Sequence, residues 1–166
     1  KFFLSNMSNL NTFHNIGRCK NFLNGETIEV KTYTIKTILK GEPLDLMRMD
    51  VEGHEVEVLN GLINSIDEIK KLPMIIFETH ISRYNKDHNF ENTLNKLFNL
   101  GYFVGMVGSS SIRGSNTVEK YGYKSIKKIK SDGEIRKIFT NIKNKDAIDL
   151  ICHKGGLRTV LLKPPF

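Results

Sequence analysis

The chain has 166 residues, of which 39% are hydrophobic and 26% are charged, and its formal net charge is +7. This length and composition predict one globular domain, residues 1–166, with a buried core. No apolar run approaches the roughly 20 residues that a membrane-spanning helix needs, so we predict no membrane span and a cytoplasmic protein. Cys19 and Cys152 lack the spacing of a zinc site. We expect two free thiols, the alternative being a single long-range disulfide.

Much of the positive charge lies in the C-terminal third of the chain. The basic residues there are interleaved with isoleucine and phenylalanine, and they are Lys124, Lys127, Lys128, Lys130, Arg136 and Lys137. This pattern is typical of a solvated face above a packed apolar stripe. The charge alone therefore does not predict a nucleic-acid partner, although it leaves an acidic partner open.

Hydrophobic periodicity predicts alternating strands and helices over the first two thirds of the chain. After a strand end at 2–4 and a loop to residue 25, we predict strands at 27–34, 44–49, 74–77 and 102–107. We predict helices at 34–40, 53–72 and 90–100, which stop at Gly41, Pro73 and Gly101. The order strand, helix, strand over residues 44–107 indicates right-handed βαβ units on a parallel sheet.

The last third of the chain has weaker patterns. Residues 108–134 are rich in Ser, Gly and Lys, and we predict an insertion or a long loop there. A short helix is predicted at 135–142 and a last strand at 147–152, followed by a tail that ends in Pro164 and Pro165.

Acidic residues follow two of the predicted strands. Asp50 and Glu52 come directly after strand 44–49, while Glu78 and His80 follow strand 74–77. If these strands are neighbours, their carboxyl ends meet at one edge of the sheet, where open α/β folds bind ligands. A histidine beside carboxylates can serve as a general base. We therefore predict these four residues as catalytic.

Each of these residues also has an ordinary structural explanation. Acids at a helix N-terminus cap free N–H groups, and His80 taken alone fits a surface loop. Gly53 permits a tight turn or a close approach of the backbone to a ligand. Carboxylates at this position can also hold Mg²⁺, an alternative that their spacing does not support, so we predict no metal site. His14, His88 and His153 have no comparable neighbours in the sequence, so we expect them to be solvated or structural.

Four short motifs carry a resemblance to a known family. In chain order they are Asp50-x-Glu52-Gly53-x-Glu55, Val58-Leu59-x-Gly61, Phe77-Glu78-x-His80 and Leu100-Gly101-Tyr102. Together they resemble the C-terminal half of FkbM-type methyltransferases, over roughly residues 20–107.

The resemblance implies an α/β fold of the Rossmann-like, class I methyltransferase type. Such a chain would have a mostly parallel sheet with flanking helices, lacking the first strands. The family implies S-adenosylmethionine (SAM) as the cofactor, with Asp50 and Gly53 contacting it. It also implies a transferase that methylates a hydroxyl group of a small-molecule acceptor, such as a sugar, a glycan or a natural product.

The cofactor half of the family's domain has no counterpart in this sequence. No Gly-x-Gly turn follows a strand before residue 44, although such a turn lets the backbone approach the cofactor. We therefore expect the chain to be the C-terminal portion of an incomplete methyltransferase domain, with most of the SAM pocket outside it. We expect these residues alone to bind SAM weakly or not at all and to be inactive. The alternative is a non-catalytic binding module of the same fold that contacts nucleic acid or an acidic partner.

Overall fold

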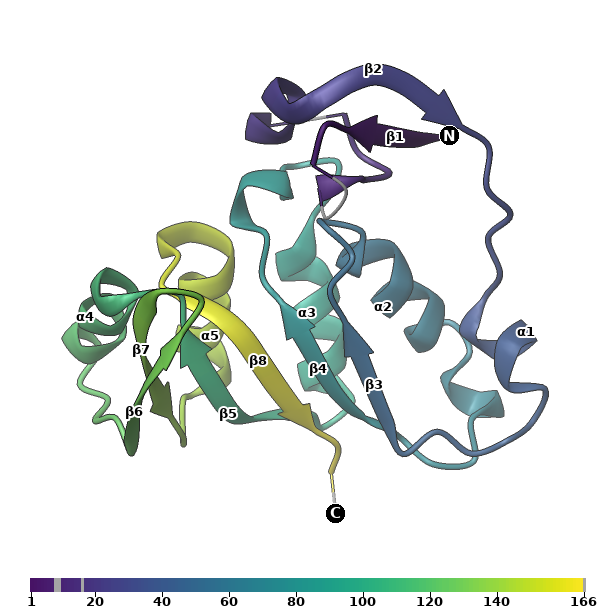
Figure 1. The fold of residues 1–166 in the computed structure, drawn as a ribbon. Coiled ribbons are helices and arrows are strands. Elements are labelled where there is room, and N and C mark those ends of the chain that lie inside the picture. The colour runs from purple at the N-terminus through teal and green to yellow at the C-terminus, as the bar shows by residue number, and fades with distance from the viewer. Residues whose placement is uncertain (8–9, 16, 166) are drawn as a thin grey trace.

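Eight strands form two sheets in the computed structural model, which describes residues 1–7, 10–15 and 17–165 (Figure 1). The smaller sheet pairs β1 (Phe2–Ser5) with β2 (Leu23–Ile28) in antiparallel orientation. The larger sheet has six strands, in the spatial order β3 (Leu46–Met49), β4 (Met74–Glu78), β8 (Leu157–Lys163), β5 (Phe103–Ser109), β7 (Glu134–Phe139) and β6 (Lys127–Ser131). The small sheet lies beyond the end of the large sheet at which β3 terminates (Figure 1).

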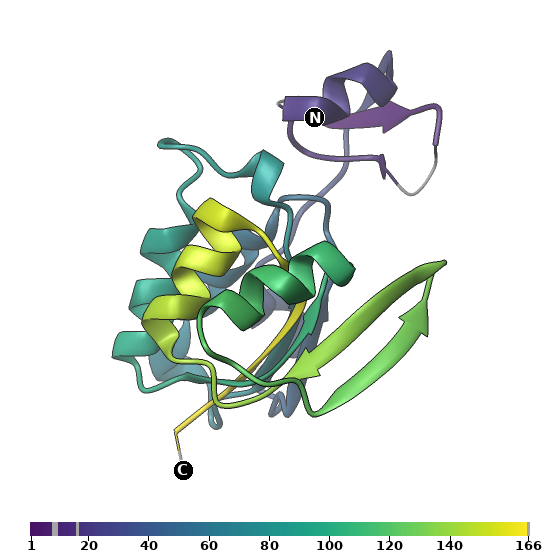
Figure 2. The same cartoon turned by 90° about the vertical axis from the view of Figure 1, so that its left-hand side faces the viewer.

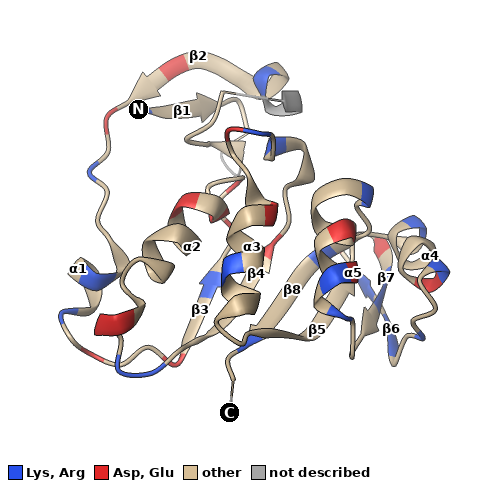
Figure 3. Ribbon diagram, turned by 180° about the vertical axis from the view of Figure 1, so that it is seen from behind, with Lys and Arg blue, Asp and Glu red and all other residues tan. Residues whose placement is uncertain are grey.

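Helices cover one face of the six-stranded sheet. The α-helices are α1 (Ile35–Leu39), α2 (Glu55–Ile63), α3 (Phe90–Asn99), α4 (Ile112–Lys120) and α5 (Asn144–Asp149). Short 3₁₀ helices are η2 (Gly17–Phe22), η3 (Ile66–Glu68) and η4 (Ile81–Arg83), and the π-helical η5 (Leu150–Lys154) continues α5. Figures 2 and 3 show α3 and α5 on the same side of the sheet. The predicted α/β class with flanking helices is confirmed.

The prediction of a mostly parallel sheet is wrong, because most neighbouring strands of the large sheet pair in antiparallel orientation. Only β3 and β4 pair in parallel, whereas the other four pairings of the large sheet are antiparallel. Two of these pairings arise because β8 returns between β4 and β5 and runs antiparallel to both, and the other two involve β7. As a result, β3, β4 and β5 still point the same way, as the βαβ pattern predicts.

The N-terminal half of the structure follows the predicted elements, with shifted boundaries. The predicted strand 27–34 overlaps β2 only at its start, and residues 29–34 form no regular element. Thr34 caps α1 by accepting a hydrogen bond from the amide of Thr37. The predicted helix 53–72 is shorter than expected, because α2 ends at Ile63 and only η3 follows it.

The predicted loop at 108–134 is wrong, because it contains α4 and β6. Ser111 begins α4 by accepting a hydrogen bond from the amide of Gly114. The small residue at position 114 is needed because a Cβ there would lie 2.5 Å from the carbonyl oxygen of Gly156. The Ser and Gly content that suggested a loop therefore serves a helix cap and close packing.

The predicted helix 135–142 is instead strand β7, which forms a hairpin with β6. Asp132 and Gly133 have φ values of 51° and 78°, and Ser131 pairs with Glu134 across them. An Asp-Gly pair with two positive φ values is typical of a two-residue hairpin turn. The Asp132-Gly133 pair is thus the local sequence signal of this hairpin.

The predicted last strand 147–152 is helical, and the true last strand is β8. Ala147, Leu150 and Ile151 are buried, and their spacing of three and four is that of one helix face. In β8, where the sequence predicts a tail, Leu157, Val160 and Leu162 are buried.

The main core lies between the helices and the sheet. Ile75 and Phe77 of β4 are fully buried, and the ring of Phe77 meets that of Phe90 from α3 at a centroid distance of 5.3 Å. Other strand residues are left open to solvent, with exposed fractions of 47% for Leu46, 38% for Met74 and 42% for Met106. Part of the sheet surface is therefore exposed.

Two further sequence predictions are free thiols at the cysteines and the lack of a membrane-spanning segment. Cys152 is a free thiol, and burial raises its pKa to about 12; the side chain of Cys19 lies outside the described residues. Within the described part of the chain, each helix is too short or too polar to span a bilayer.

Candidate active site

The carboxyl ends of β3 and β4 lie side by side, because these strands pair in parallel and in register. Asp50 and Glu52 follow β3, Glu78 is the last residue of β4, and His80 comes two residues later. The structure therefore brings the four predicted catalytic residues to one edge of the sheet. Their catalytic roles stay predictions.

His80 is at the centre of this group. Its Nδ1 lies 2.8 Å from Oε1 of Glu55, which is fully buried at the start of α2. Its Nε2 lies 3.7 Å from a carboxylate oxygen of Asp50 and 3.7 Å from one of Glu52. A single imidazole thus faces carboxylates on both sides, and we call these residues, with Glu78, the acidic cluster.

The acidic cluster changes the protonation of its members. Burial lowers the pKa of His80, but the hydrogen bond to Glu55 and the charges of Glu55, Glu52 and Asp50 outweigh it, so that the pKa is raised. Burial raises the pKa of Glu52, and the positive charge of His80 opposes this shift. His80 is therefore more readily protonated than a free histidine.

Buried polar groups hold Glu55 in place. The hydroxyl of Tyr84 donates to Oε2 of Glu55 at 3.3 Å, and the amide of Gly53 donates to Oε1 at 3.3 Å. Tyr84 also accepts a hydrogen bond from the amide of His80 at 2.9 Å. Both side chains that contact the carboxylate thus belong to the segment after β4, which fixes the His80 ring.

Asp50 and Glu78 complete the group on the more open side. One ligand atom from each of Asp50, Glu78 and His80 lies within 4.8 Å of the other two, a spacing at which a cation could be held. Glu78 is also paired with Nε of Arg158 at 2.9 Å. Asp50, with a side chain 37% exposed, is the member that a ligand can reach most easily.

The turn between β3 and α2 has an unusual backbone. Glu52 and Gly53 have φ values of 49° and 98°, and the first is uncommon for a residue with a side chain. A Cβ at Gly53 would lie 2.6 Å from Cγ of Arg83, and Nη2 of Arg83 donates to Glu52 at 3.2 Å. Close packing against Arg83 thus accounts for the glycine, while the predicted cofactor contact of Gly53 stays a prediction.

A second group of side chains escaped the sequence reasoning. His14 and His88, expected to be solvated or structural, lie around Glu57 together with His54. Nδ1 of His88 is 3.0 Å from Oε1 of Glu57, and its Nε2 contacts the carbonyl oxygen of Gly53. We call His14, His54, His88 and Glu57 the histidine cluster.

Burial lowers the pKa values of His14 and His54 in the histidine cluster, although Glu57 opposes this shift. His88 behaves differently: burial lowers its pKa, but its hydrogen bonds to Glu57 and to the carbonyl of Gly53 raise it overall. The His54–Glu57 spacing of three residues on α2 was a signal in the sequence, whereas nothing local linked His14 to them.

Basic residues of the C-terminal third are interspersed with acidic residues along the chain. Figure 3 shows acidic segments among the basic ones on α4, α5 and β7. Lys137 lies 2.7 Å from Glu119, and the buried Arg136 lies 3.2 Å from Asp132. Part of the charge therefore stabilises the hairpin and its contact with α4.

Comparisons with known proteins identify the family. The Methyltransferase FkbM domain matches residues 3–104, which is more than half of the chain. A curated protein named "Putative methyltransferase" from Jannaschia sp. (strain CCS1) is 35% identical over 60 residues, covering 36% of this chain and only 20% of that protein. No solved structure matches the chain. The matched segment includes β3, α2, β4 and the acidic cluster, and the chain belongs to the FkbM methyltransferase domain family.

Proposed function

We propose that this chain forms the C-terminal part of a SAM-dependent methyltransferase domain that acts on a hydroxyl group of a sugar or natural product. The observation that carries the proposal is the position of His80, between buried Glu55 and the more exposed carboxylates of Asp50 and Glu52. This arrangement supports proton removal from a hydroxyl at the carboxyl end of a parallel strand pair.

The geometry of His80 indicates which nitrogen would accept the proton. Nδ1 donates to Glu55, because an ionised carboxylate can only accept. In the neutral ring the lone pair is therefore on Nε2, which is 3.7 Å from Asp50 and from Glu52. That distance exceeds a hydrogen bond, so an acceptor hydroxyl can approach Nε2 without breaking an existing one. Asp50 and Glu52 would then orient the hydroxyl and stabilise the protonated ring.

The residues present also fit a cationic cofactor. SAM carries a sulfonium and an ammonium group, and a carboxylate at the strand end favours such charges. Asp50, as the most accessible acid of the cluster, would make this contact. When bound, SAM supplies the activated methyl group.

The shape of the sheet supports the proposal that the domain continues beyond these residues. β3 lies at the edge of the large sheet, and among the described residues no strand pairs with its outer side. An unpaired edge and an exposed apolar sheet surface favour further pairing and covering. The remaining part of the cofactor pocket would then lie next to β3, beside Asp50.

Isothermal titration with SAM tests this proposal on two lengths of the protein. We expect the 166-residue chain to bind SAM weakly or not at all, and a protein extended by its upstream coding sequence to bind it. Micromolar affinity of the short chain would refute the partial pocket. If the extended protein does not bind SAM, the proposal of a SAM-dependent enzyme is refuted, and the alternative of a non-catalytic binding module is favoured.

Substitution of His80 tests the catalytic assignment in the extended protein. We expect His80→Gln to lower transfer of a labelled methyl group to a panel of sugars by about 10²–10⁴-fold, the usual contribution of a general base. Asp50→Asn should weaken SAM affinity, and the exposed His153→Gln serves as the control. Equal rates for His80→Gln and the control would remove His80 from the mechanism.

A further inference from the structure

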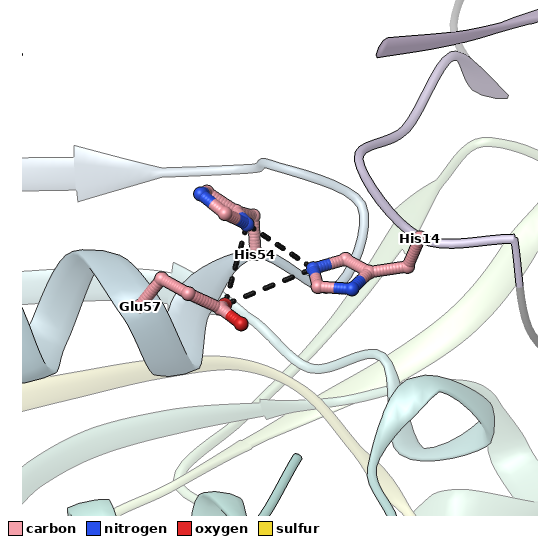
Figure 4. A group of neighbouring side chains, drawn as sticks. All are labelled: His14, His54 and Glu57. Carbon is pink, nitrogen blue, oxygen red and sulfur yellow. Dashed lines mark hydrogen bonds and ion pairs between the residues drawn. The ribbon is translucent and has the colours of Figure 1, made fainter. Parts of the chain in front are cut away.

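Three ligand atoms of the histidine cluster converge on one point (Figure 4). Nε2 of His14 is 3.1 Å from Nδ1 of His54. Oε2 of Glu57 is 3.3 Å from that same nitrogen of His54 and 3.7 Å from Nε2 of His14. Figure 4 shows the two rings and the carboxylate directed toward one another, with His54 and Glu57 at the start of α2 and His14 on a separate segment.

We propose that His14, His54 and Glu57 bind a divalent transition-metal ion of the zinc class, which fastens the N-terminal segment to the start of α2. This site is separate from the acidic cluster and does not depend on the methyltransferase proposal. Its ligands, two imidazole nitrogens and one carboxylate oxygen, are those that Zn²⁺ uses with a water molecule in the fourth position.

The three distances fit the size of such an ion. A triangle with sides of 3.1, 3.3 and 3.7 Å has a circumradius of about 2.0 Å, and Zn–N and Zn–O bonds are about 2.0–2.2 Å long. An ion at bonding distance from all three atoms therefore lies slightly outside their plane. This is the position that a tetrahedral centre takes above three of its ligands.

Neighbouring groups orient two of the three ligands. Nδ1 of His88 lies 3.0 Å from Oε1 of Glu57, the carboxylate oxygen other than the proposed ligand. The ring of Phe13 stacks on that of His54 at a centroid distance of 4.4 Å and an angle of 28°. Such partners commonly fix the orientation of metal ligands. Glu57 is also 42% exposed, so a water molecule can reach the fourth position.

The site would join parts of the chain that local structure does not connect. His14 and His54 are 40 residues apart in sequence. Next to His14, the buried Thr12 donates its hydroxyl to the carbonyl of Glu52 at 3.0 Å. A metal ion at this position would therefore strengthen an existing contact between the β1–β2 sheet region and the turn that carries the acidic cluster.

Titration with Zn²⁺ alone tests the site in the 166-residue chain after removal of metal with a chelator. We expect one equivalent to bind, and Co²⁺ to give the intense visible absorption of a tetrahedral centre. His14→Gln and His54→Gln should each weaken Zn²⁺ binding at least 100-fold. His153→Gln, at an exposed histidine that also pairs with a glutamate, should bind Zn²⁺ as the wild type does.

Two further measurements keep the test decisive. Asp50→Asn alters the other group of possible ligands, Asp50, Glu78 and His80. If Asp50→Asn abolishes Zn²⁺ binding and His14→Gln does not, the proposal is overturned. The Co²⁺ spectrum requires no substitution, so a wild-type chain that gives no tetrahedral absorption also overturns it. In that case the two rings share only a hydrogen bond.

Discussion

Two histidine–carboxylate clusters share the connection between β3 and α2, but they combine the same residue types in opposite proportions. The acidic cluster places His80 among several carboxylates. The histidine cluster places Glu57 among three imidazole rings. Burial alone lowers the pKa of a histidine in either environment. The pKa of His80 nevertheless rises, while the pKa values of His14 and His54 fall.

The comparison shows that the number of carboxylates per imidazole decides the chemistry of each cluster. Several acids around one ring favour a protonated histidine, which can exchange a proton with a bound group. In the histidine cluster the lowered pKa values leave His14 and His54 with neutral nitrogens that can share a cation. The pKa of His88 is instead raised, because burial is outweighed by its hydrogen bonds to Glu57 and to a backbone carbonyl. Residues 52–57 contribute to both clusters, so a single turn holds members of two different groups of side chains.

The largest expected effect is the loss of Glu55, which holds the acidic cluster together. Glu55→Ala removes the partner of His80, Tyr84 and the amide of Gly53. We expect the free energy of unfolding in urea to fall by about 3–5 kcal/mol, as for other broken buried pairs. Glu68→Ala, at an exposed acid paired with a lysine, should change it by about 0–1 kcal/mol. If Glu55→Ala and Glu68→Ala lower the free energy of unfolding equally, the contacts of Glu55 in the acidic cluster add no stability.

A smaller loss is expected from a change in the turn that both clusters share. Gly53→Ala places a Cβ 2.6 Å from Arg83 at a φ of 98°, which we expect to cost about 1–3 kcal/mol of unfolding free energy. Gly61→Ala is the matched control, because a Cβ added at Gly61 would meet no atom within 4 Å beyond the backbone of its own helix. Within a helix this change should stabilise by about 0.5–1 kcal/mol. If Gly53→Ala lowers the melting temperature and Gly61→Ala raises it, the loss comes from the geometry of the turn and not from the removal of a glycine. If both variants change it in the same direction, the turn does not require Gly53.

The histidine cluster should respond to the removal of His88. His88→Asn removes the contacts with Glu57 and with the carbonyl of Gly53. In the presence of a chelator we expect the free energy of unfolding to fall by about 1.5–3 kcal/mol, the usual value for hydrogen bonds to a charged group. His153→Asn, at an exposed pair with Glu91, should lose about 0–1 kcal/mol. If both variants unfold at the same urea concentration, His88 does not stabilise Glu57.

The smallest expected effect is the pH dependence that His80 contributes. The carboxylates that face it are Asp50, Glu52, Glu55 and Glu78. Its folded pKa is raised above the unfolded value of 6.5. The stabilisation is therefore fully present below pH 6.5 and is lost as the pH rises through the folded pKa. An NMR titration of the His80 ring with a midpoint below 6.5 would contradict this sign.

The sequence was most informative where one local pattern decides the structure. The run into Asp50, the helix with Val58-Leu59-x-Gly61 and the run into Glu78 predicted β3, α2 and β4 in order. The family match over residues 3–104 includes this unit. In residues 108–163 the predicted loop, helix and last strand are wrong, although the Asp132-Gly133 pair indicates a hairpin turn and the spacing around Leu150 indicates a helix. Those two signals were present in the sequence.

The α/β class and the acids that follow the two parallel strands can be predicted from the sequence, because strand and helix periods and turn residues are local properties. The family follows from short motifs that lie within the match over residues 3–104. The position of β8 between β4 and β5 follows from tertiary packing, since a strand's period does not specify its partner. Only the fold brings His14 to His54 across 40 residues. The acidic cluster was visible from its strand ends, whereas the histidine cluster arises from packing between distant segments.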